Sequence, residues 1–195
     1  MDFTTRQVEI IEAATKLIGE KGIQNVTTKN LAEQIGFSEP ALYRHFKGKT
    51  DILVSVLEYF RGKMREGLEP LLAKEGSGLE KVHQLIKYQF DMFTNNPAVI
   101  MVIFAETSFQ YDKKLSNTVS KLLQQKKQLV LTILREGVID GSVRNDIDLD
   151  QLTSIILGSM RFNVLQWRLS SFDFDMNKKG EELWKTLNLL IKTKH

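Results

Sequence analysis

Hydrophobic residues recur every three to four positions along most of the chain, which is the period of an α-helix with one buried face. Near the N-terminus, the stripe is formed by Ile10, Ile11, Ala14, Leu17 and Ile18. Comparable stripes, separated by Gly, Pro and Asn residues, predict about nine helices. The apolar run 99–104 alone has the composition of a buried strand, but the chain offers it no partner strand. The pattern therefore predicts an all-α fold.

The stretch 27–46 predicts two short helices joined by a tight turn. Gly36 ends the apolar stripe of the first helix, where a left-handed residue is needed to stop it. Ser38 is a good N-cap for the second helix, and Pro40 falls in its first turn, where a missing N–H is harmless. We interpret this stretch as a helix-turn-helix motif whose second helix has about two turns. The alternative is a solvated helical hairpin with a basic edge.

The second helix of this pair carries side chains suited to nucleic acid. Leu42 and Phe46 lie four residues apart and should anchor the helix to the core, so its other side chains face outward. Arg44 can donate two parallel hydrogen bonds to guanine or to a phosphate, and Lys49 adds positive charge beyond the helix. The net charge of +3 is only mildly basic, so this local cluster is the stronger indication of DNA.

The composition narrows the classes of function. The chain of 195 residues contains no cysteine and three histidines, so it has no thiol nucleophile or thiolate metal site. It contains no serine elbow, glycine-rich nucleotide loop or HExxH motif, and we therefore expect no enzyme, no cofactor and no metal. The longest apolar run, 98–105, is too short to span a membrane, and the N-terminus lacks the features of a secretory signal. We expect a cytoplasmic protein.

Residues 4 to about 60 resemble the DNA-binding domain of the tetracycline-repressor (TetR) family. The resemblance rests on IIEAATKLIGEKG, VTTKNLAEQIGFS and PALYRHFKGKTDIL, which follow one another in this order. It implies an all-α homodimer whose N-terminal domain binds a near-palindromic double-stranded DNA operator and whose C-terminal domain binds a small effector. It divides the chain into a helix-turn-helix domain, 1–50, a connecting helix, 51–68, and an effector-binding and dimerisation domain, 69–195.

The resemblance also implies which residues contact DNA. Those expected at the phosphates are Thr28, Lys29, Tyr43, His45 and Lys49. Those expected to face the bases are Ser38, Glu39, Pro40, Ala41 and Arg44. Pro40 stands where relatives often have Gly, and Glu39 brings a negative charge towards the groove. The base sequence of the operator is therefore not implied.

The C-terminal half is rich in aromatic and methionine residues, which are typical of a pocket for a hydrophobic or planar molecule. An ordinary core has the same composition. The candidate effector-binding residues are His83, Tyr88, Gln89, Phe93, Met101, Phe104, Phe109, Asn163 and Trp167. Relatives with a similar C-terminal segment include regulators that respond to acyl-CoA, so the lysine-rich helix that begins near 113 is a candidate for the anionic head group. A solvated charged face is the alternative.

The last two helices, expected at about 149–169 and 176–192, form the dimer interface in relatives. Gly158 and Ser159 make a thin patch that another helix can approach closely. The candidate interface residues are Ile155, Gly158, Ser159, Phe162, Trp184, Leu187 and Ile191. The alternative is that both helices are buried within their own subunit.

These features together predict a transcriptional regulator, and specifically a repressor that a small hydrophobic or amphipathic effector releases from its operator. The alternative is a DNA-bound assembly or accessory factor of the same fold, which acts through a protein partner and has no small-molecule effector. An open C-terminal cavity favours the repressor, whereas a closed and well-filled core favours the accessory factor.

Overall fold

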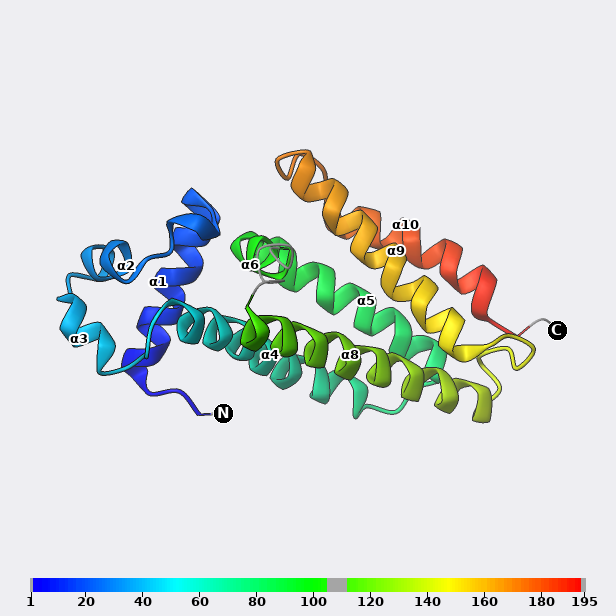
Figure 1. Ribbon diagram of the computed structural model, residues 1–195. Coiled ribbons are helices and arrows are strands. Elements are labelled where there is room, and N and C mark those ends of the chain that lie inside the picture. Colours follow the sequence, from blue (N-terminus) through cyan, green and yellow to red (C-terminus); the bar gives the residue numbers. More distant parts are fainter. Residues whose placement is uncertain (1, 105–111, 194–195) are drawn as a thin grey trace. The chain divides into compact units, whose positions relative to one another are not determined.

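A computed structural model of the protein describes residues 2–104 and 112–193 (Figure 1). In these two ranges the regular structure is helical, apart from an isolated antiparallel bridge between Val143 and Lys192. The all-α fold expected from the periodicity is therefore confirmed. The chain forms two compact units, unit 1 (Met1–Met64 and Asn96–Leu122) and unit 2 (Arg65–Asn95 and Leu123–His195).

Unit 1 contains the helices of the N-terminal part of the chain and one helix from its middle. They are α1 (Thr5–Lys21), the short 3-10 helix η1 (Ile23–Asn25), α2 (Thr28–Ile35), α3 (Glu39–Tyr43), the first part of α4 (Lys49–Leu72), and α6 (Pro97–Ile103). A capping box between Thr4 and Gln7 begins α1, as the Thr-x-x-Gln spacing predicts. Because Gly19 has no Cβ, α1 can approach α6 closely: a Cβ there would lie 2.8 Å from that of Ala98.

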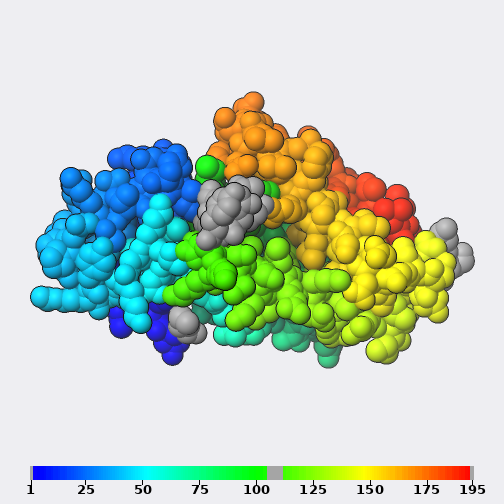
Figure 2. All heavy atoms as spheres, in the orientation of Figure 1, coloured from blue at the N-terminus to red at the C-terminus, as the bar shows by residue number. Residues whose placement is uncertain are grey.

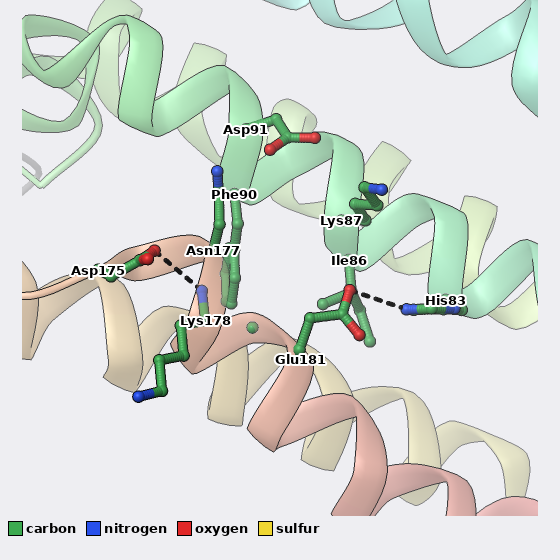
Figure 3. Close-up of a pocket in the computed structure, with 10 residues that line it drawn as sticks. His83, Ile86, Lys87, Phe90, Asp91, Asp175, Asn177, Lys178 and Glu181 are labelled. Atoms are coloured by element: carbon green, nitrogen blue, oxygen red, sulfur yellow. Dashed lines mark hydrogen bonds and ion pairs between the residues drawn. The ribbon is translucent and has the colours of Figure 1, made fainter.

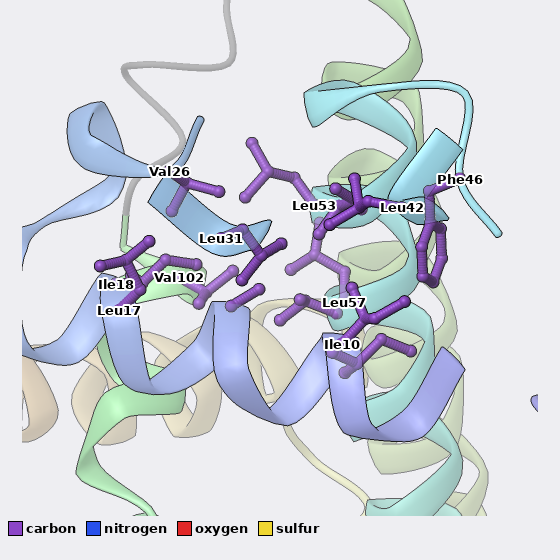
Figure 4. Packing of buried hydrophobic residues seen from close by; sticks show 14 of the residues in the cluster. Ile10, Leu17, Ile18, Val26, Leu31, Leu42, Phe46, Leu53, Leu57 and Val102 are labelled. Atoms are coloured by element: carbon purple, nitrogen blue, oxygen red, sulfur yellow. The ribbon is translucent and has the colours of Figure 1, made fainter. Parts of the chain in front are cut away.

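The core of unit 1 lies among α1, α2, α3 and α4 (Figure 4). The side chains of Leu42 and Phe46 are only 0% and 3% exposed, so α3 is anchored as their spacing predicts. Val102 of α6 and Leu115 at the start of α8 (Lys113–Ile139) belong to the same cluster. The described parts of this segment, 96–104 and 112–122, thus pack with the helix-turn-helix, although the sequence placed them in the C-terminal domain. Periodicity shows that a helix is buried, but not which core receives it.

Unit 2 contains the remaining helices. They are the last part of α4, α5 (Gly78–Asn95), most of α8, α9 (Leu149–Leu169) and α10 (Met176–Ile191). The last of these packs against both α5 and α9. Two glycines allow close packing in this unit. A Cβ added at Gly78 would lie 2.3 Å from the backbone nitrogen of Gly137, and a Cβ added at Gly180 would lie 2.4 Å from the ring of Phe90.

Two helices differ in length from what the sequence predicts. α3 has five residues rather than about two turns. α4 continues through Pro70 to Leu72 instead of ending near 68. Pro70 lies in the last turn, so the one backbone hydrogen bond that its missing N–H cannot make is lost near the end of α4 rather than in its middle. Within the described ranges, no helix is both long and apolar enough to cross a membrane.

Candidate functional site

Local capping interactions set the geometry of the α2–α3 pair. Gly36 has φ +68°, in the left-handed region that glycine adopts without strain. The N–H of Phe37 then donates to the carbonyl of Ala32 over 2.8 Å, which completes the end of α2. The side chain of Ser38 accepts the N–H of Ala41 over 3.4 Å and so caps α3. The turn that the sequence predicted is therefore present, with Gly36 and Ser38 in the expected roles.

The residues expected at DNA lie on α2, α3 and the segments next to them, and their solvent exposure varies. Figure 2 shows this part of the chain, in light blue to cyan, at the surface of unit 1. The exposed residues are Lys29, Ser38, Pro40, Tyr43 and Arg44. The partly buried residues are Thr28, Glu39, Ala41, His45 and Lys49. The exposed set includes two cations, so the outer side of the pair can contact a phosphate backbone.

Three of these residues form a hydrogen-bond network between α2 and α3. The hydroxyl of Thr28 donates to Oε1 of Glu39 over 2.7 Å. The same hydroxyl lies 3.4 Å from the phenol oxygen of Tyr43. Glu39 is therefore held against the N-terminus of α2, where a carboxylate is favourable for the helix dipole. The sequence placed Glu39 towards the bases, but did not indicate this positioning role, because Thr28 and Glu39 are far apart along the chain.

Lys49 does not project freely towards solvent. Its Nζ donates to the carbonyl of Ile23 over 3.1 Å and thereby ties η1 to the start of α4. Burial lowers the pKa of this ammonium. The sequence placed Lys49 at a phosphate, and the structure shows that one of its three N–H groups is already used within the chain.

The candidate effector residues are divided between the two units. Gln89, Phe93, Asn163 and Trp167 are buried in unit 2. Tyr88 is partly buried near Gly67, also in unit 2. Met101 and Phe104 belong to unit 1, and Met101 packs against the helix-turn-helix core. Phe109 lies outside the described residues. Four of the nine candidates are therefore buried in one unit, and these four remain the best candidates.

A lysine that the sequence treated as part of a charged face is partly buried, and its ammonium contacts a buried side chain of unit 2. Nζ of Lys126 donates a hydrogen bond to Oε1 of Gln89, whose side chain is itself buried. Burial, and secondarily the positive charge of Arg161, lower the pKa of Lys126 to about 7. The spacing of Leu122, Lys126 and Leu129 could have indicated this position, because Lys126 interrupts an apolar stripe of α8.

Gln89 and Asn163 interrupt apolar stripes in the same way. Gln89 lies between Ile86 and Phe93 on α5, and Asn163 lies between Met160 and Trp167 on α9. Asn163 is satisfied locally, since its Nδ2 donates to the carbonyl of Ser159 over 2.8 Å. The indole N–H of Trp167 is buried and has no hydrogen-bond partner among the described residues. Unit 2 therefore has polar groups in its interior as well as on its surface.

His83 lies apart from this interior, at a surface hollow of about 450 Å³ between α5 and α10 (Figure 3). Its Nε2 lies 3.2 Å from Oε1 of Glu181, and its ring stacks on Trp184 with centroids 4.6 Å apart. Phe90 and Gly180 also line the hollow. His83 and Trp184, which the sequence assigned to different sites, are thus direct neighbours.

One face of α9 presents apolar side chains to solvent. Ile155 is 51% exposed, Phe162 58% and Leu169 71%. Between the first two, Gly158 is exposed, and an added Cβ would meet no atom within 4 Å. Figure 2 shows α9, in yellow to orange, at the surface of unit 2. This face, with Ser159 partly exposed beside it, suits the close approach of another helix.

The candidate interface residues of α10 are placed differently. The side chains of Leu187 and Ile191 are 2% and 0% exposed, so both are buried in the core of their own chain. The alternative, burial within their own subunit, describes these two residues. Leu189 and Leu190 are instead 66% and 50% exposed. The apolar stripe of α10 is wide enough to serve two faces, and periodicity alone did not distinguish the inner face from the outer one.

The residues 2–104 and 112–193 contain no group of three or more His, Cys, Asp or Glu side chains that could hold a metal ion. The arrangement offers instead an exposed basic helix pair, an apolar outer face on α9 and a partly polar interior in unit 2.

Comparison with known proteins covers nearly the whole chain. Residues 10–56 match the model of the bacterial regulatory proteins of the tetR family, and residues 58–193 match the model of the YsiA-like protein C-terminal region. The nucleoid occlusion factor SlmA of Vibrio vulnificus (strain YJ016) is 23% identical over 190 residues, 97% of each chain. The fatty acid metabolism regulator protein of Bacillus subtilis (strain 168) is 24% identical over 171 residues, 88% of each chain.

A solved structure shows the same fold. The transcriptional regulator FadR from Bacillus subtilis, in complex with stearoyl-CoA, superposes with a TM-score of 0.84 at 23% identity and covers 92% of this chain and 96% of its own. The predicted helix-turn-helix lies within the part of the chain that matches the tetR-family model, and the second model covers most of the remaining residues. This chain belongs to the TetR family of bacterial regulatory proteins and carries a YsiA-like C-terminal region.

Proposed function

We propose that this protein is a one-component repressor that binds a near-palindromic operator as a homodimer and leaves it when an acyl-CoA or a similar long-chain amphipathic molecule binds to unit 2. The observation that carries the DNA-binding part is the α2–α3 pair, whose outer side exposes Arg44, Lys29 and Tyr43 while Leu42 and Phe46 anchor it. Residues that contact bases specify a site, and phosphate contacts orient the protein on it.

The exposed apolar face of α9 supports the homodimer. Ile155, Phe162 and Leu169 would remain in water in a single chain, whereas a second copy would bury them. In a two-fold dimer the same face meets itself, so Gly158 of each copy would allow the two α9 helices to approach closely. Two copies would present two α3 helices to successive major grooves, about 34 to 36 Å apart.

The effector class is supported by the relatives and by the interior of unit 2. The YsiA-like model covers residues 58–193, and the similar FadR structure is a complex with stearoyl-CoA. Phe93 and Trp167 supply apolar surface, while Gln89 and Lys126 supply polar groups inside the same unit. A molecule with a long alkyl chain and a charged head fits both kinds of group. The effector would act by preferring a conformation in which the two α3 helices no longer match both half-sites.

Selection of bound duplexes from a randomised DNA pool at two salt concentrations tests the DNA-binding part. We expect recovery of an inverted repeat, with an affinity that falls steeply as salt rises. Adding palmitoyl-CoA to the complex with the recovered operator then tests the effector, and we expect the protein to dissociate. An enriched repeat that palmitoyl-CoA does not release, even at saturation, would exclude this effector class and leave operator binding intact.

The similarity to the nucleoid occlusion factor SlmA, over 97% of each chain, favours a second candidate. In this alternative the protein binds DNA and acts through a protein partner, without a small effector. Binding that depends on salt but shows no sequence preference, together with no response to acyl-CoA, would favour it over the repressor.

A further inference from the structure

We infer that Lys126 binds an oxyanion of the effector inside unit 2, with Gln89 holding the ammonium in place and Arg161 adding positive potential. The oxyanion would be a phosphate of an acyl-CoA or the carboxylate of a free fatty acid. This inference deepens the proposed function and rests on it. It names the residue that binds the charged part of the effector. Most other lysines of the protein lie at the surface.

The neighbouring lysines of α8 show how Lys126 differs. Nζ of Lys114 pairs with Asp51 over 2.9 Å, and Nζ of Lys127 pairs with Asp150 over 2.9 Å, with both lysines substantially exposed. Nζ of Lys126 instead donates to the neutral amide oxygen of Gln89. Among residues 2–104 and 112–193, no carboxylate pairs with Lys126. An ammonium taken out of water without an opposite charge is unfavourable, so its retention needs another reason.

The charges around Lys126 would attract an anion. Arg161 on α9 is close enough that its positive charge contributes to lowering the pKa of Lys126. The group that α5 turns towards it, Gln89, is neutral. A bound oxyanion would meet the Lys126 ammonium in a partly buried environment, where such an interaction is stronger than at a fully exposed surface. The unpartnered indole N–H of Trp167, also in unit 2, is a further buried donor that an acceptor on the ligand could satisfy.

Binding of an oxyanion should therefore be coupled to uptake of a proton by Lys126. Because burial lowers its pKa to about 7, Lys126 loses much of its positive charge as the pH rises from 7 to 8. A negative charge beside the amine raises that pKa and favours the protonated form. With full protonation in the complex, more of a proton is taken up at pH 8 than at pH 7.

Isothermal titration calorimetry in buffers of different ionisation enthalpy measures both affinity and proton uptake. The probes are palmitoyl-CoA, palmitate and the neutral methyl palmitate. Lys126→Met should weaken binding of at least one anionic probe by about 10- to 100-fold and abolish its proton uptake, while changing methyl palmitate by less than about threefold. Loss with palmitoyl-CoA alone assigns the oxyanion to a phosphate, because the acyl end of palmitoyl-CoA is a neutral thioester. Loss with palmitate alone assigns it to the fatty-acid carboxylate, and loss with both shows that Lys126 accepts either anion.

Two further variants separate this role from a general effect of charge. Lys121 lies on the exposed side of the same helix, so Lys121→Met should leave affinity within about twofold. Lys126→Arg keeps the positive charge but does not release its proton, so it should bind an anionic probe without proton uptake at pH 8. This variant decides the question if Lys126→Met does not fold.

The outcomes distinguish this inference from the proposed function. If the unmodified protein binds palmitoyl-CoA or palmitate, but Lys126→Met and Lys126→Arg leave affinity and proton uptake unchanged, the oxyanion assignment alone is overturned. If the unmodified protein binds neither anionic probe, the effector class is overturned together with it, while operator binding is judged separately by the duplex selection.

Discussion

The α2–α3 pair of unit 1 and the interior of unit 2 place their polar residues in opposite ways. In the pair, Leu42 faces the core and Arg44 faces solvent, as in an ordinary amphipathic helix. In unit 2, Gln89 and Lys126 occupy positions of apolar stripes and meet each other inside the protein. The first arrangement stabilises the fold and leaves the polar groups free for a large external partner. The second is unfavourable for stability on its own, which is typical of a site that awaits a ligand.

The comparison predicts that changes at outer faces alter association and leave the stability of the single chain nearly unaffected. The largest such effect should come from Gly158→Leu on α9. A leucine there would separate the two helices of the proposed interface, and loss of the second half-site contact should weaken operator binding by at least about 100-fold. Sedimentation of the purified variant should show monomers.

Gly158→Leu carries its own control for folding. An added Cβ meets nothing within 4 Å in the single chain, and replacing a helical glycine should stabilise the helix by up to about 1 kcal/mol. The melting temperature should therefore not fall at low protein concentration. A variant that sediments as a dimer of normal affinity would exclude this face as the interface.

A smaller loss of affinity is expected for Arg44→Ala. Arg44 is exposed on the outer side, so its truncation should leave the free energy of unfolding within about 0.5 kcal/mol. Operator binding should weaken by about 1 to 3 kcal/mol if the guanidinium contacts a base, with relaxed preference at one position of each half-site. Lys29→Ala is the matched comparison, since a lost phosphate contact should weaken all duplexes alike and reduce the salt dependence. Equal losses on all sequences for both variants would assign Arg44 to the backbone.

Inside unit 2, the opposite behaviour is expected: a change that removes the polar group should stabilise the protein. The folded-state pKa of Lys126, about 7, lies below the ordinary value of 10.5, so the unfolded chain binds more protons between these values. The free energy of unfolding should then rise with pH across this window, by at most about 1.4 kcal/mol per pH unit. Below pH 7 the full penalty of burying the charge is present.

Urea unfolding of the protein and of Lys126→Met at several values between pH 7 and pH 10 measures the contribution of Lys126. It is the difference between the two free energies of unfolding at each pH. The methionine variant should be more stable at pH 7, and the gap should shrink as the pH rises. A constant gap across the range would show that Lys126 titrates near its ordinary pKa.

The smallest effect concerns the network that orients α3. Thr28→Val and Glu39→Gln each disturb the 2.7 Å hydrogen bond between these side chains. A double-mutant cycle on the free energy of unfolding should give a coupling of about 0.5 to 1.5 kcal/mol. Tyr43→Phe tests the weaker 3.4 Å contact and should change stability less. Zero coupling would mean that Glu39 is available to the DNA rather than occupied by Thr28.

The sequence could predict the DNA-binding part because its determinants are local. Gly36 and Ser38 act through backbone atoms a few residues away, and Leu42 and Phe46 share one face of one helix. The exceptions, Glu39 and Lys49, bond to residues 11 and 26 positions away. No periodicity encodes such pairings, so their roles appeared only in the structure.

For the C-terminal half, the sequence determined the helices and their buried stripes but not the partner of each stripe. It could not show that Val102 belongs to the core of unit 1. Nor could it show that Leu187 is buried within its own chain while Leu189 is exposed. It also presented Lys126 as one lysine among several, although its ammonium meets Gln89 from another helix. The sequence by itself thus decided the secondary structure, the helix-turn-helix and its exposed cations, because these depend on contacts within a few turns. Only the tertiary structure decided which polar groups are enclosed and which apolar ones stay in water, because burial depends on which helices pack together.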